Sequence, residues 1–411
     1  MFIERDVYKR LEKELKRKQI TAIVGARQVG KTTLMKKLME DINEEKIYLS
    51  FENIKILALF DNDVDLFIST YIKPYKYIFI DEFQYSKNGG KNLKYIYDMN
   101  PGKKIFISGS SYSELSINSI QYLVGRVNII TIYPLTFAEF VKYKYKDYYN
   151  LLLNKNSEES FGLLKDLFFE YITFGGYPEV VIEKDYELKK DLLRDIMNTY
   201  LLKEIKDILD FKNLFEFENL ITRLALQDGS ILNKSNIAQD LDINRNKISE
   251  MLSVLEKTYI LSVVRPYLRN KIREQIKSPK IYFNDLGLKN AVINNFNVPK
   301  IRDDKGSIYE NFVLSQLIRK DIKLSYFNIN KRYEIDFVVE YGGFRYGIEV
   351  KSKLKDNVIL KSINKFRNLF KVKKIFVLNK EVMDVRKVED VEVVYTYYTD
   401  IFNIISEIKK S

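Results

Sequence analysis

The chain has 411 residues, of which 68 are Lys or Arg and 56 are Asp or Glu, so its formal net charge is +12. It contains no cysteine and no histidine, which excludes disulfides, thiol nucleophiles, iron–sulfur clusters, thiolate zinc sites, the Ser-His-Asp triad and imidazole metal sites. Any reaction must therefore use carboxylates, lysines, hydroxyl groups and a hard cation such as Mg²⁺.

The positive charge favours a polyanionic partner. Nucleic acid is preferred over a membrane because no Lys/Arg-rich amphipathic anchor stands out, and a role in solubility alone is the alternative. The length exceeds one hydrophobic core, so we expect roughly two to four domains. The start, MFIERDVYKR, is charged where a signal peptide needs an apolar core, and no apolar run approaches about 18 residues. We expect a cytoplasmic protein with no membrane partner.

The segment from Gly25 to Thr32 reads GARQVGKT and fits the pattern G-x-x-x-x-G-K-[ST] of a phosphate-binding loop. An apolar run at 20–24 precedes it and an amphipathic run at 34–42 follows it, which predicts the strand and helix that such a loop requires. Gly25 and Gly30 allow backbone angles that turn successive N–H groups toward one anion. The N-terminus of the predicted helix adds partial positive charge at the same point.

We expect Lys31 to reach the terminal phosphates of ATP and the Thr32 hydroxyl to ligand the Mg²⁺ that accompanies it. A glycine turn with a nearby lysine is the alternative, but the fixed positions and both flanking runs agree with the loop. ATP and Mg²⁺ are therefore the expected cofactors. The predicted cofactor-binding residues of the loop are Gly25, Ala26, Arg27, Gln28, Val29, Gly30, Lys31, Thr32 and Thr33.

Short apolar runs at 77–80 and 105–107 alternate with helical segments, which indicates parallel strands covered on both faces. Ligands of such sheets lie beyond the carboxyl ends of the strands. Asp81 at the end of the first run fits the acid that holds Mg²⁺ through water, and Glu82 fits a base that orients the attacking water. A solvated acidic pair is the alternative explanation.

Two further residues are candidates for the nucleotide site. Ser110 follows the second run and is expected to sense the γ-phosphate. Arg126, in LVGRV, is a candidate cation for transition-state charge, acting within the chain or across a subunit interface. A surface arginine beside a turn is an equally good interpretation of Arg126.

The middle of the chain predicts helices. Residues 147–212 read as helices interrupted at Gly175-Gly176-Tyr177-Pro178, which is either a hinge between domains or a rigid helix stop. Further helices are expected at 214–226, 235–241 and 245–255, followed by an alternating strand at 260–264. Three helices and such a wing make a winged helix-turn-helix, which either contacts DNA or serves as a spacer or a protein-docking surface. The apolar residues expected to face its core are Ile248, Met251, Leu252 and Leu255, and those expected to project outward are Arg245, Asn246 and Lys247.

The stretch RYEIDFVVEYGGFRYGIEVKSK predicts a hairpin whose turn is Gly342-Gly343. Cross-strand partners then have numbers that sum to 685, so Asp336 stands opposite Glu349. Alternation places Glu334, Asp336, Glu349 and Lys351 on one face. The opposite face is expected to be a core of Ile335, Phe337, Val339, Ile348 and Val350.

Two carboxylates directly opposite each other, with Cβ atoms about 5 Å apart, destabilise a sheet unless positive charge lies between them. Mg²⁺, with ligands at about 2.1 Å, fits between Asp336 and Glu349. Lys351 beside it is placed to orient or activate a water for attack on phosphorus. The alternative is a surface ion network in which Lys351 pairs with Glu334.

The motifs GARQVGKTTL, IFIDEFQ, ISGSS, LVGRV, YPLTFAEF and YITFGGYPE together resemble AAA-type P-loop ATPases that carry a C-terminal module similar to restriction endonucleases. The resemblance covers nearly the whole chain. It implies an AAA-like nucleotide site at Lys31, Thr32, Asp81 and Glu82. It also implies a PD-(D/E)XK nuclease-like fold, in which Glu310 matches the position of a third metal-binding carboxylate.

We therefore expect an α/β protein with an AAA-like P-loop domain at 1–145, a helical linker at 146–213, a winged helix-turn-helix at 214–285 and a nuclease-like domain at 286–411. The first functional hypothesis is a Mg²⁺-dependent ATPase coupled to nucleic-acid binding and to DNA cleavage. The second is a nucleotide-dependent switch or scaffold that binds DNA or a protein partner and cuts nothing. A homo-oligomer is also open, because AAA-like ATPases often assemble.

Overall fold

The computed structural model describes residues 2–109, 120–153, 158–200, 214–320, 322–330, 332–354 and 356–410. The chain divides into two compact units. Unit 1 comprises residues 1–133 with 254–260, and unit 2 comprises residues 134–253 with 261–411. Within the described ranges, no helix combines the length and the apolar character that crossing a membrane requires.

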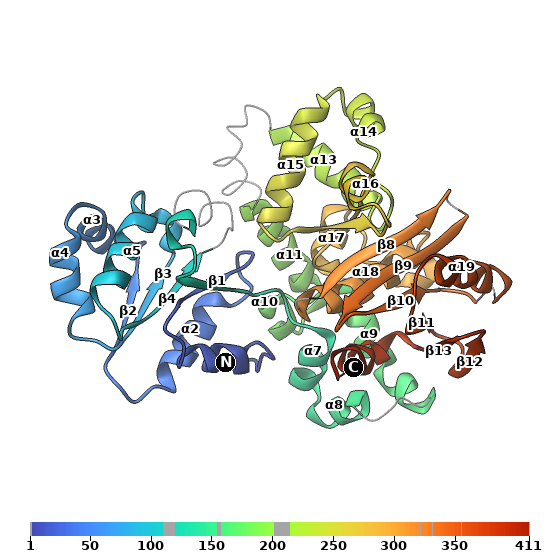
Figure 1. The fold of residues 1–411 in the computed structure, drawn as a ribbon, viewed down its shortest axis with the longest axis horizontal. Helices are drawn as coiled ribbons and strands as arrows, with labels where there is room; N and C mark the ends of the chain where they lie inside the picture. Colours follow the sequence, from blue (N-terminus) through green and yellow to red (C-terminus); the bar gives the residue numbers. More distant parts are fainter. Residues whose placement is uncertain are drawn as a thin grey trace. The chain divides into compact units, whose positions relative to one another are not determined.

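Unit 1 is built on a five-stranded sheet in which every neighbouring pair of strands is parallel. The strand order is β2-β3-β4-β1-β5, drawn from blue to teal in Figure 1. β1 and β4 are buried along their whole length, which confirms the parallel strands predicted from uninterrupted apolar runs. The strands are β1 (Ile20–Val24), β2 (Lys46–Ser50), β3 (Tyr77–Asp81), β4 (Lys104–Gly109) and β5 (Val127–Thr131).

Helices and aromatic side chains complete the core of unit 1. Phe51, Phe60, Phe67 and Phe83 pack with the strand residues in one buried cluster. Because the strands are parallel, the loop after β1 and the residues after β3 lie at the same carboxyl edge of the sheet. The helices are α1 (Tyr8–Glu14), α2 (Lys31–Glu40), α3 (Ile54–Asn62), α4 (Val64–Phe67) and α5 (Gly89–Met99).

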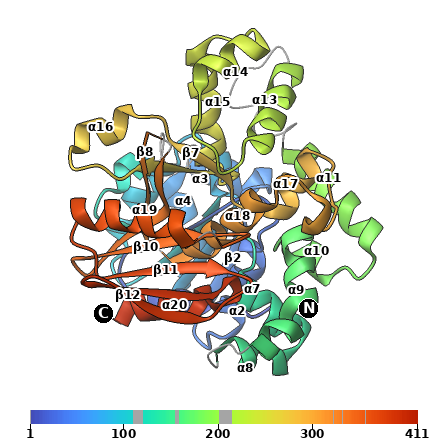
Figure 2. The same cartoon turned by 90° about the vertical axis from the view of Figure 1, so that its right-hand side faces the viewer.

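Unit 2 contains an eight-stranded mixed sheet of order β12-β13-β11-β10-β9-β8-β6-β7. Figure 2 shows its strands in a view turned by 90° from that of Figure 1. A buried cluster on this sheet joins residues of β9, β11 and β13 to Ile359, Ile363 and Phe366 of α19. The strands are β6 (Leu261–Pro266), β7 (Lys280–Phe283), β8 (Lys323–Ile329), β9 (Tyr333–Tyr341), β10 (Phe344–Val350), β11 (Lys374–Asn379), β12 (Asp384–Val388) and β13 (Val391–Tyr397).

Helices of unit 2 precede and follow these strands. They are α7 (Phe137–Lys144), α8 (Lys146–Leu153), α9 (Glu158–Phe174), α10 (Pro178–Ile182), α11 (Tyr186–Tyr200), α13 (Leu214–Leu226), α14 (Lys234–Leu241), α16 (Lys271–Ile276), α17 (Leu286–Val292), α18 (Lys305–Leu317), α19 (Asp356–Leu369) and α20 (Ile401–Lys410). One more helix, α15 (Arg245–Lys257), continues past residue 253, where the division between the units falls. α7 belongs to unit 2, so the ATPase boundary predicted at residue 145 lies beyond the end of unit 1.

The three helices predicted between residues 214 and 255 are present as α13, α14 and α15, and all four apolar residues predicted to face the core are buried. The strand predicted as a wing is β6. It pairs with β7 in antiparallel fashion and with β8 in parallel fashion. This strand therefore belongs to the large sheet, and the sheet crosses the boundary predicted between residues 285 and 286.

The hairpin register predicted from Gly342-Gly343 is confirmed. Phe344 pairs with Tyr341 and Ile348 pairs with Phe337, as the sum of 685 requires. All five residues predicted to form the core face are buried. Strict alternation is not kept in β9, however, because Ile335 and Val338 lie in the same buried cluster. A register shift between β8 and β9 at Ser325 and Phe327 accounts for the difference, since an extra residue breaks the two-residue period.

The Gly175-Gly176 turn is a rigid helix stop inside unit 2. Gly175 has φ +74, and a Cβ there would lie 2.0 Å from Oδ1 of Asp285. The Gly176 N–H donates to Oδ2 of Asp285 at 2.7 Å, and the Gly176 carbonyl accepts from the N–H of Leu135 at 2.7 Å. Residues 134–253 form one compact unit, so the turn does not separate the two units.

Candidate functional site

The P-loop follows β1 and ends where α2 begins. Gly30 precedes α2 with φ 93, a left-handed conformation that glycine adopts without steric cost. Gly25 has φ +151, and a Cβ there would lie 2.1 Å from the carbonyl oxygen of Ile132. Both pattern glycines are therefore required by the backbone, as the sequence predicted.

Lys31 lies inside the loop. Its side chain is buried, and its Nζ donates to the carbonyl oxygens of Gly25 at 2.9 Å and of Ala26 at 2.8 Å. A phosphate oxygen bound in the loop would make a charge-assisted hydrogen bond with this ammonium group. Among the other loop residues, Val29 is buried and Thr33 is exposed.

Arg5 positions the loop from the N-terminal segment, and sequence reasoning missed it. Its guanidinium donates to the carbonyl of Val29 at 3.1 Å and to the carbonyl of Tyr133 at 2.5 Å. Arg5 is buried, so this bidentate contact fixes the backbone at the apex of the loop. No local pattern marks Arg5, because its partners lie 24 and 128 residues away.

Thr32 and Asp81 meet at the carboxyl edge of the sheet. The Thr32 hydroxyl donates to Oδ2 of Asp81 at 2.7 Å, and the Tyr48 hydroxyl donates to the same oxygen at 2.5 Å. The Ser108 hydroxyl donates a hydrogen bond to the other carboxylate oxygen of Asp81, Oδ1. A hydroxyl and a carboxylate are hard oxygen donors of the kind that Mg²⁺ prefers. Thr32 and Asp81 therefore fit the ion that accompanies ATP.

Glu82 follows Asp81 in a left-handed conformation, with φ 54. Its carboxylate accepts a hydrogen bond from the Gln84 amide, a contact that sequence reasoning did not anticipate. Burial raises the pKa of the Glu82 carboxyl, while the Gln84 hydrogen bond and the charge of Lys31 oppose the rise. A carboxylate with a raised pKa beside the P-loop lysine suits the predicted general base.

Two nucleotide-site candidates remain. Ser110 lies outside the described residues. Arg126 precedes β5, whose first residue Val127 pairs with Ile20 at the start of β1. It therefore lies at the amino ends of the strands, opposite the P-loop, where its Nε is 2.8 Å from Oδ1 of Asp98. This position corrects the idea that Arg126 acts on its own chain's nucleotide, and it leaves two interpretations: a surface arginine beside a turn, or a residue that acts across a subunit interface.

A second group of charged residues lies in unit 2. A cleft of about 620 Å³ is lined by Lys280, Glu310, Glu334, Asp336 and Lys351, among others. These residues come from β7, α18, β9 and the end of β10. The predicted carboxylates Asp336 and Glu310 are thus brought together with Lys351 on one cleft.

The carboxylates of Asp336 and Glu349 each accept a hydrogen bond from a backbone N–H of the neighbouring strand, just beyond the last paired residues of β9 and β10. The Asp336 N–H donates to Oε2 of Glu349 at 3.1 Å, and the Val350 N–H donates to Oδ2 of Asp336 at 2.8 Å. Both carboxylates are buried. The two carboxyl groups therefore lie close together, as the prediction expects, although the strand pairing itself ends at Ile348 and Phe337.

Lysines supply the positive charge between the carboxylates. Lys351 Nζ is 2.5 Å from Oε1 of Glu349 and 3.7 Å from Oδ2 of Asp336. Lys280 Nζ is 2.8 Å from Oε1 of Glu310 and 2.8 Å from Oε1 of Glu334. Lys280, which sequence reasoning missed, pairs with Glu334, whereas the alternative interpretation of this face had paired Glu334 with Lys351.

The ionisation of these groups reflects burial and crowding. Burial, reinforced by the charge of Asp336, raises the pKa of Glu349 to about 8. Burial also raises the pKa of Glu310 to about 7, although Lys280 opposes the rise. Burial alone would lower the pKa of Lys351, but the charges of Asp336 and Glu349 outweigh it and raise that pKa.

The Mg²⁺ site predicted for the unit 2 cluster stays a prediction. In the described part of the chain, no group of three acidic side chains is arranged to hold a metal ion. Lys280 contacts a carboxylate oxygen of Glu310, and Lys351 contacts one of Glu349, so two of the predicted ligands pair with lysines. Asp336, Glu349 and Glu310 thus lie in a mixed carboxylate–lysine cluster, and their role as metal ligands is not tested by these contacts.

The residues predicted to project from the recognition helix lie at the start of α15. Arg245 and Asn246 are exposed, while Lys247 is half-buried and pairs with Glu216 of α13. Arg245 and Asn246 are thus exposed to solvent at the N-terminus of α15.

Three parts of the chain are similar to known families. Residues 17–141 match a family described as an AAA domain. Residues 165–298 and 305–399 match two families described only as domains of unknown function, DUF8612 and DUF4143.

Full-length relatives exist in several organisms. An uncharacterized protein of Methanocaldococcus jannaschii is 26% identical over 376 residues, covering 89% of this chain and 82% of the relative. An uncharacterized protein of Haemophilus influenzae is 26% identical over 400 residues, covering 92% of each. Among solved structures, the Walker-type ATPase of Pyrococcus abyssi is 18% identical with a TM-score of 0.43, covering 71% of this chain and 96% of that one.

The parallel sheet, the P-loop and the Thr32–Asp81 contact define a P-loop nucleotide-binding domain. Together with the family match over residues 17–141, they show that this part of the chain is similar to AAA-type P-loop ATPase domains.

Proposed function

We propose that the protein is a Mg²⁺-dependent ATPase whose ATP cycle controls nucleic-acid binding by unit 2. The observation that carries the ATPase half is the direct contact of Thr32 with Asp81 beside a buried Lys31. These are the three residue types that hold the phosphates and the accompanying metal in P-loop enzymes. The expected compartment is the cytoplasm.

Each residue of the nucleotide site has a separate task. Lys31 exchanges its contacts with the loop carbonyls for oxygens of the terminal phosphates. Thr32 and Asp81 would hold Mg²⁺, which when bound neutralises charge on the phosphates. Glu82 accepts the proton of the attacking water, and its raised pKa makes it a stronger base than an exposed carboxylate.

The cleft of unit 2 is the proposed nucleic-acid site. Lys353 and Lys351 line it beside the backbone of Gly229, and lysines and backbone N–H groups are common phosphate contacts. ATP then acts by binding one state of the protein more tightly than the other, so that hydrolysis reverses the change in nucleic-acid affinity.

Cleavage of DNA is the first candidate activity of this cleft. Asp336, Glu349 and Lys351 keep the order D…E-x-K of PD-(D/E)XK nucleases, and the hairpin register brings them together. In this arrangement Lys351 is placed to hold a phosphate oxygen or a water near the carboxylates.

A non-cleaving switch that binds DNA or a protein partner is the second candidate. Lys280 favours it, because its ammonium group lies 2.8 Å from two carboxylates of the cluster and neutralises part of their charge. A cluster neutralised by its own lysines has less need of a divalent cation, which nuclease chemistry at two carboxylates requires.

A cleavage assay separates the two candidates. The full chain is incubated with supercoiled, linear or branched DNA, with and without ATP, in Mg²⁺ or in EDTA. A nuclease cuts in Mg²⁺, and Asp336→Ala abolishes cutting while the exposed Asp303→Ala leaves it unchanged. Equal cutting by Asp336→Ala contradicts the hairpin assignment, and no cutting together with ATP-dependent DNA binding establishes the switch.

A further inference from the structure

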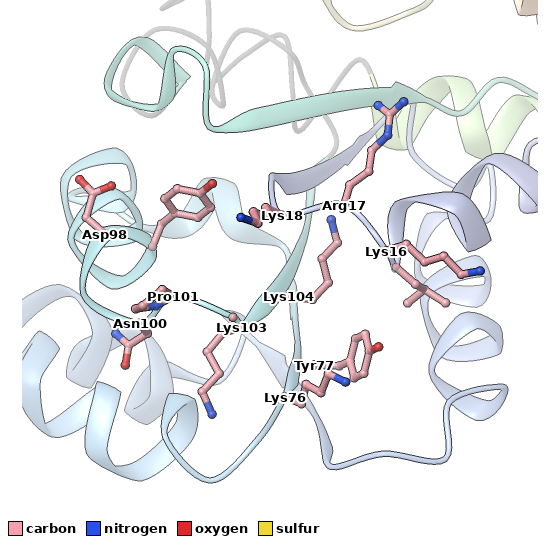
Figure 3. Close-up of a pocket in the computed structure, with 13 residues that line it drawn as sticks. Lys16, Arg17, Lys18, Lys76, Tyr77, Asp98, Asn100, Pro101, Lys103 and Lys104 are labelled. Atoms are coloured by element: carbon pink, nitrogen blue, oxygen red, sulfur yellow. The ribbon is translucent and has the colours of Figure 1, made fainter.

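A strongly basic hollow lies in unit 1, away from the nucleotide site. It has a volume of about 400 Å³ and is lined by six cationic side chains and a single acidic one, Asp98. Figure 3 shows the chain segments around it. We call it the basic hollow, and its cations are Lys16, Arg17, Lys18, Lys76, Lys103 and Lys104.

The basic hollow sits at the amino edge of the parallel sheet. Residues 16–18 precede β1, Lys76 precedes β3, and Lys103 precedes β4. The P-loop lies at the other end of β1, a strand of 5 residues, so roughly 17 Å of strand separates the two places. The hollow is therefore distinct from the ATP site.

Most of the positive charge in the basic hollow is not neutralised. Asp98 pairs with Arg126 at 2.8 Å, and among the lining cations Lys76 pairs with Glu44 at 2.5 Å and Arg17 with Glu14 at 3.4 Å. No described acidic side chain lies within ion-pair distance of the other four lysines, which are Lys16, Lys18, Lys103 and Lys104. An excess of positive charge in a concave surface attracts anions.

Two lysines are held in place by neutral acceptors. Lys104 is buried, and its Nζ donates to the Gln19 carbonyl at 2.5 Å and to the Thr21 hydroxyl at 2.8 Å. Lys103 Nζ donates to two backbone carbonyls at 2.7 Å each. Burial lowers the pKa of Lys104 to about 8, because the charged ammonium group loses hydration. A bound anion would offset this loss of hydration free energy.

Aromatic rings stand among the lysines. Tyr77 and Tyr97 line the basic hollow with Pro101, and both rings are partly exposed. Sites that bind single-stranded nucleic acid combine two elements: positive charges along the phosphate backbone and aromatic rings on which the bases stack. An acidic peptide would use the lysines but not the rings. A free nucleotide would engage few of the cations, which come from three separate segments.

We propose that the basic hollow binds single-stranded nucleic acid, with phosphates on Lys16, Lys18 and Lys103 and a base against Tyr77. This inference rests on the proposed function, because it assumes that the protein binds nucleic acid. It adds a second contact surface and specifies that this surface binds single strands. The hollow would hold a strand on unit 1, in addition to the cleft of unit 2.

The test compares two charge-reversal variants of the full chain. One is Lys16→Glu with Lys18→Glu, in the basic hollow, and the matched control is Lys55→Glu with Lys91→Glu, on exposed lysines of α3 and α5. Binding of a labelled single-stranded oligonucleotide is measured by fluorescence anisotropy over a range of salt concentrations. We expect the hollow variant to lose at least about tenfold in affinity and its slope of log affinity against log salt to fall by roughly 1.4, for two lost phosphate contacts. The control variant should keep the wild-type slope.

A stacking variant and competitors complete the test. Tyr77→Ala should weaken oligonucleotide binding without changing the salt slope, since it removes no charge. ATP turnover by each variant, measured in parallel, reports that the ATPase fold is intact. Equal salt slopes for the hollow and control variants overturn the proposal. Displacement of the oligonucleotide by polyglutamate or by inorganic phosphate at matched charge overturns it as well, because either anion lacks a base.

The outcomes also separate this inference from the proposed function. If wild type and hollow variant bind the oligonucleotide equally, while Lys353→Glu in the unit 2 cleft weakens binding, the basic hollow is excluded and nucleic-acid binding stands. If the wild-type protein binds duplex DNA but no single-stranded oligonucleotide, the inference about the basic hollow fails alone. If it binds neither even at low salt, both fail.

Discussion

The Lys280 ammonium nitrogen lies 2.8 Å from Oε1 of Glu310. The two residues belong to β7 and α18, and the contact places a buried lysine inside the carboxylate cluster. Burial alone would lower the pKa of Lys280, but the charge of Glu310 outweighs it and keeps the pKa well above the usual value. The cluster thus contains its own cation.

Removing Lys280 should destabilise the protein. In Lys280→Met, Glu310 and Glu334 lose their partner, and breaking a buried pair costs about 3–5 kcal/mol in free energy of unfolding. Urea unfolding measures the loss, and Lys323→Met, at an exposed position of β8, is the control. We also expect millimolar Mn²⁺ to restore part of the stability of Lys280→Met. Equal stability of Lys280→Met and wild type would show that the pair contributes nothing.

The stability contributed by Glu349 should depend on pH. Burial, reinforced by Asp336, raises the pKa of Glu349 to about 8, whereas the unfolded value is about 4.3. The folded protein therefore keeps a proton that the unfolded chain releases. This stabilising contribution is complete below about pH 4.3 and is lost as the pH rises through about 8.

Glu349→Gln removes this titration. We expect the unfolding midpoint of the variant, relative to that of wild type, to increase between about pH 5 and pH 9. Urea unfolding across this range measures it, and Glu250→Gln, at an exposed position of α15, is the control. A difference that stays constant with pH would place the pKa of Glu349 in the ordinary range.

Glu82 should be needed for turnover but not for ATP binding. Glu82→Gln keeps the size of the side chain and removes the base, so we expect ATP affinity within a few-fold of wild type and turnover lower by roughly 10²–10⁴. Phosphate release and fluorescent-nucleotide binding measure the two quantities. The exposed Glu45→Gln is the control. Retained turnover in Glu82→Gln would move the base to another residue.

Lys31 should be needed for binding itself. Lys31→Ala removes the ammonium group that the P-loop holds for the phosphates, and we expect ATP affinity to fall by at least about tenfold. Fluorescent-nucleotide titration measures the change against Lys55→Ala, which alters an exposed lysine of the same unit. Unchanged affinity would mean that ATP does not use this loop.

Arg5 should act as a positioning residue for the P-loop. Arg5→Gln removes the contacts to the Val29 and Tyr133 carbonyls, so the loop apex loses its fixed backbone. We expect KM for ATP to rise about tenfold while kcat changes by less than about threefold, since Arg5 touches no reacting atom. Arg5→Lys, which keeps one donor group, should recover part of the KM. An equal loss in kcat and KM for both variants would indicate general misfolding.

Local patterns in the sequence determined much of this protein. GARQVGKT predicted a loop whose two glycines have positive φ, and the Gly342-Gly343 turn predicted the register of β9 and β10. Such features depend on residues close together in the chain, where backbone geometry and side-chain period are set locally. The parallel sheet of unit 1 followed from the same kind of pattern, because uninterrupted apolar runs fit only strands covered on both faces.

Only the tertiary structure decided which charges meet. Lys280 reaches Glu310 and Glu334 across 30 and 54 positions of sequence, Arg5 reaches Tyr133 across 128, and three distant segments build the basic hollow. The LVGRV motif made Arg126 a candidate for the nucleotide site, but the direction of β5 places it at the opposite edge of the sheet. These contacts arise from strand order and packing, and no spacing along the chain specifies which distant side chains the fold brings within a few ångströms of each other.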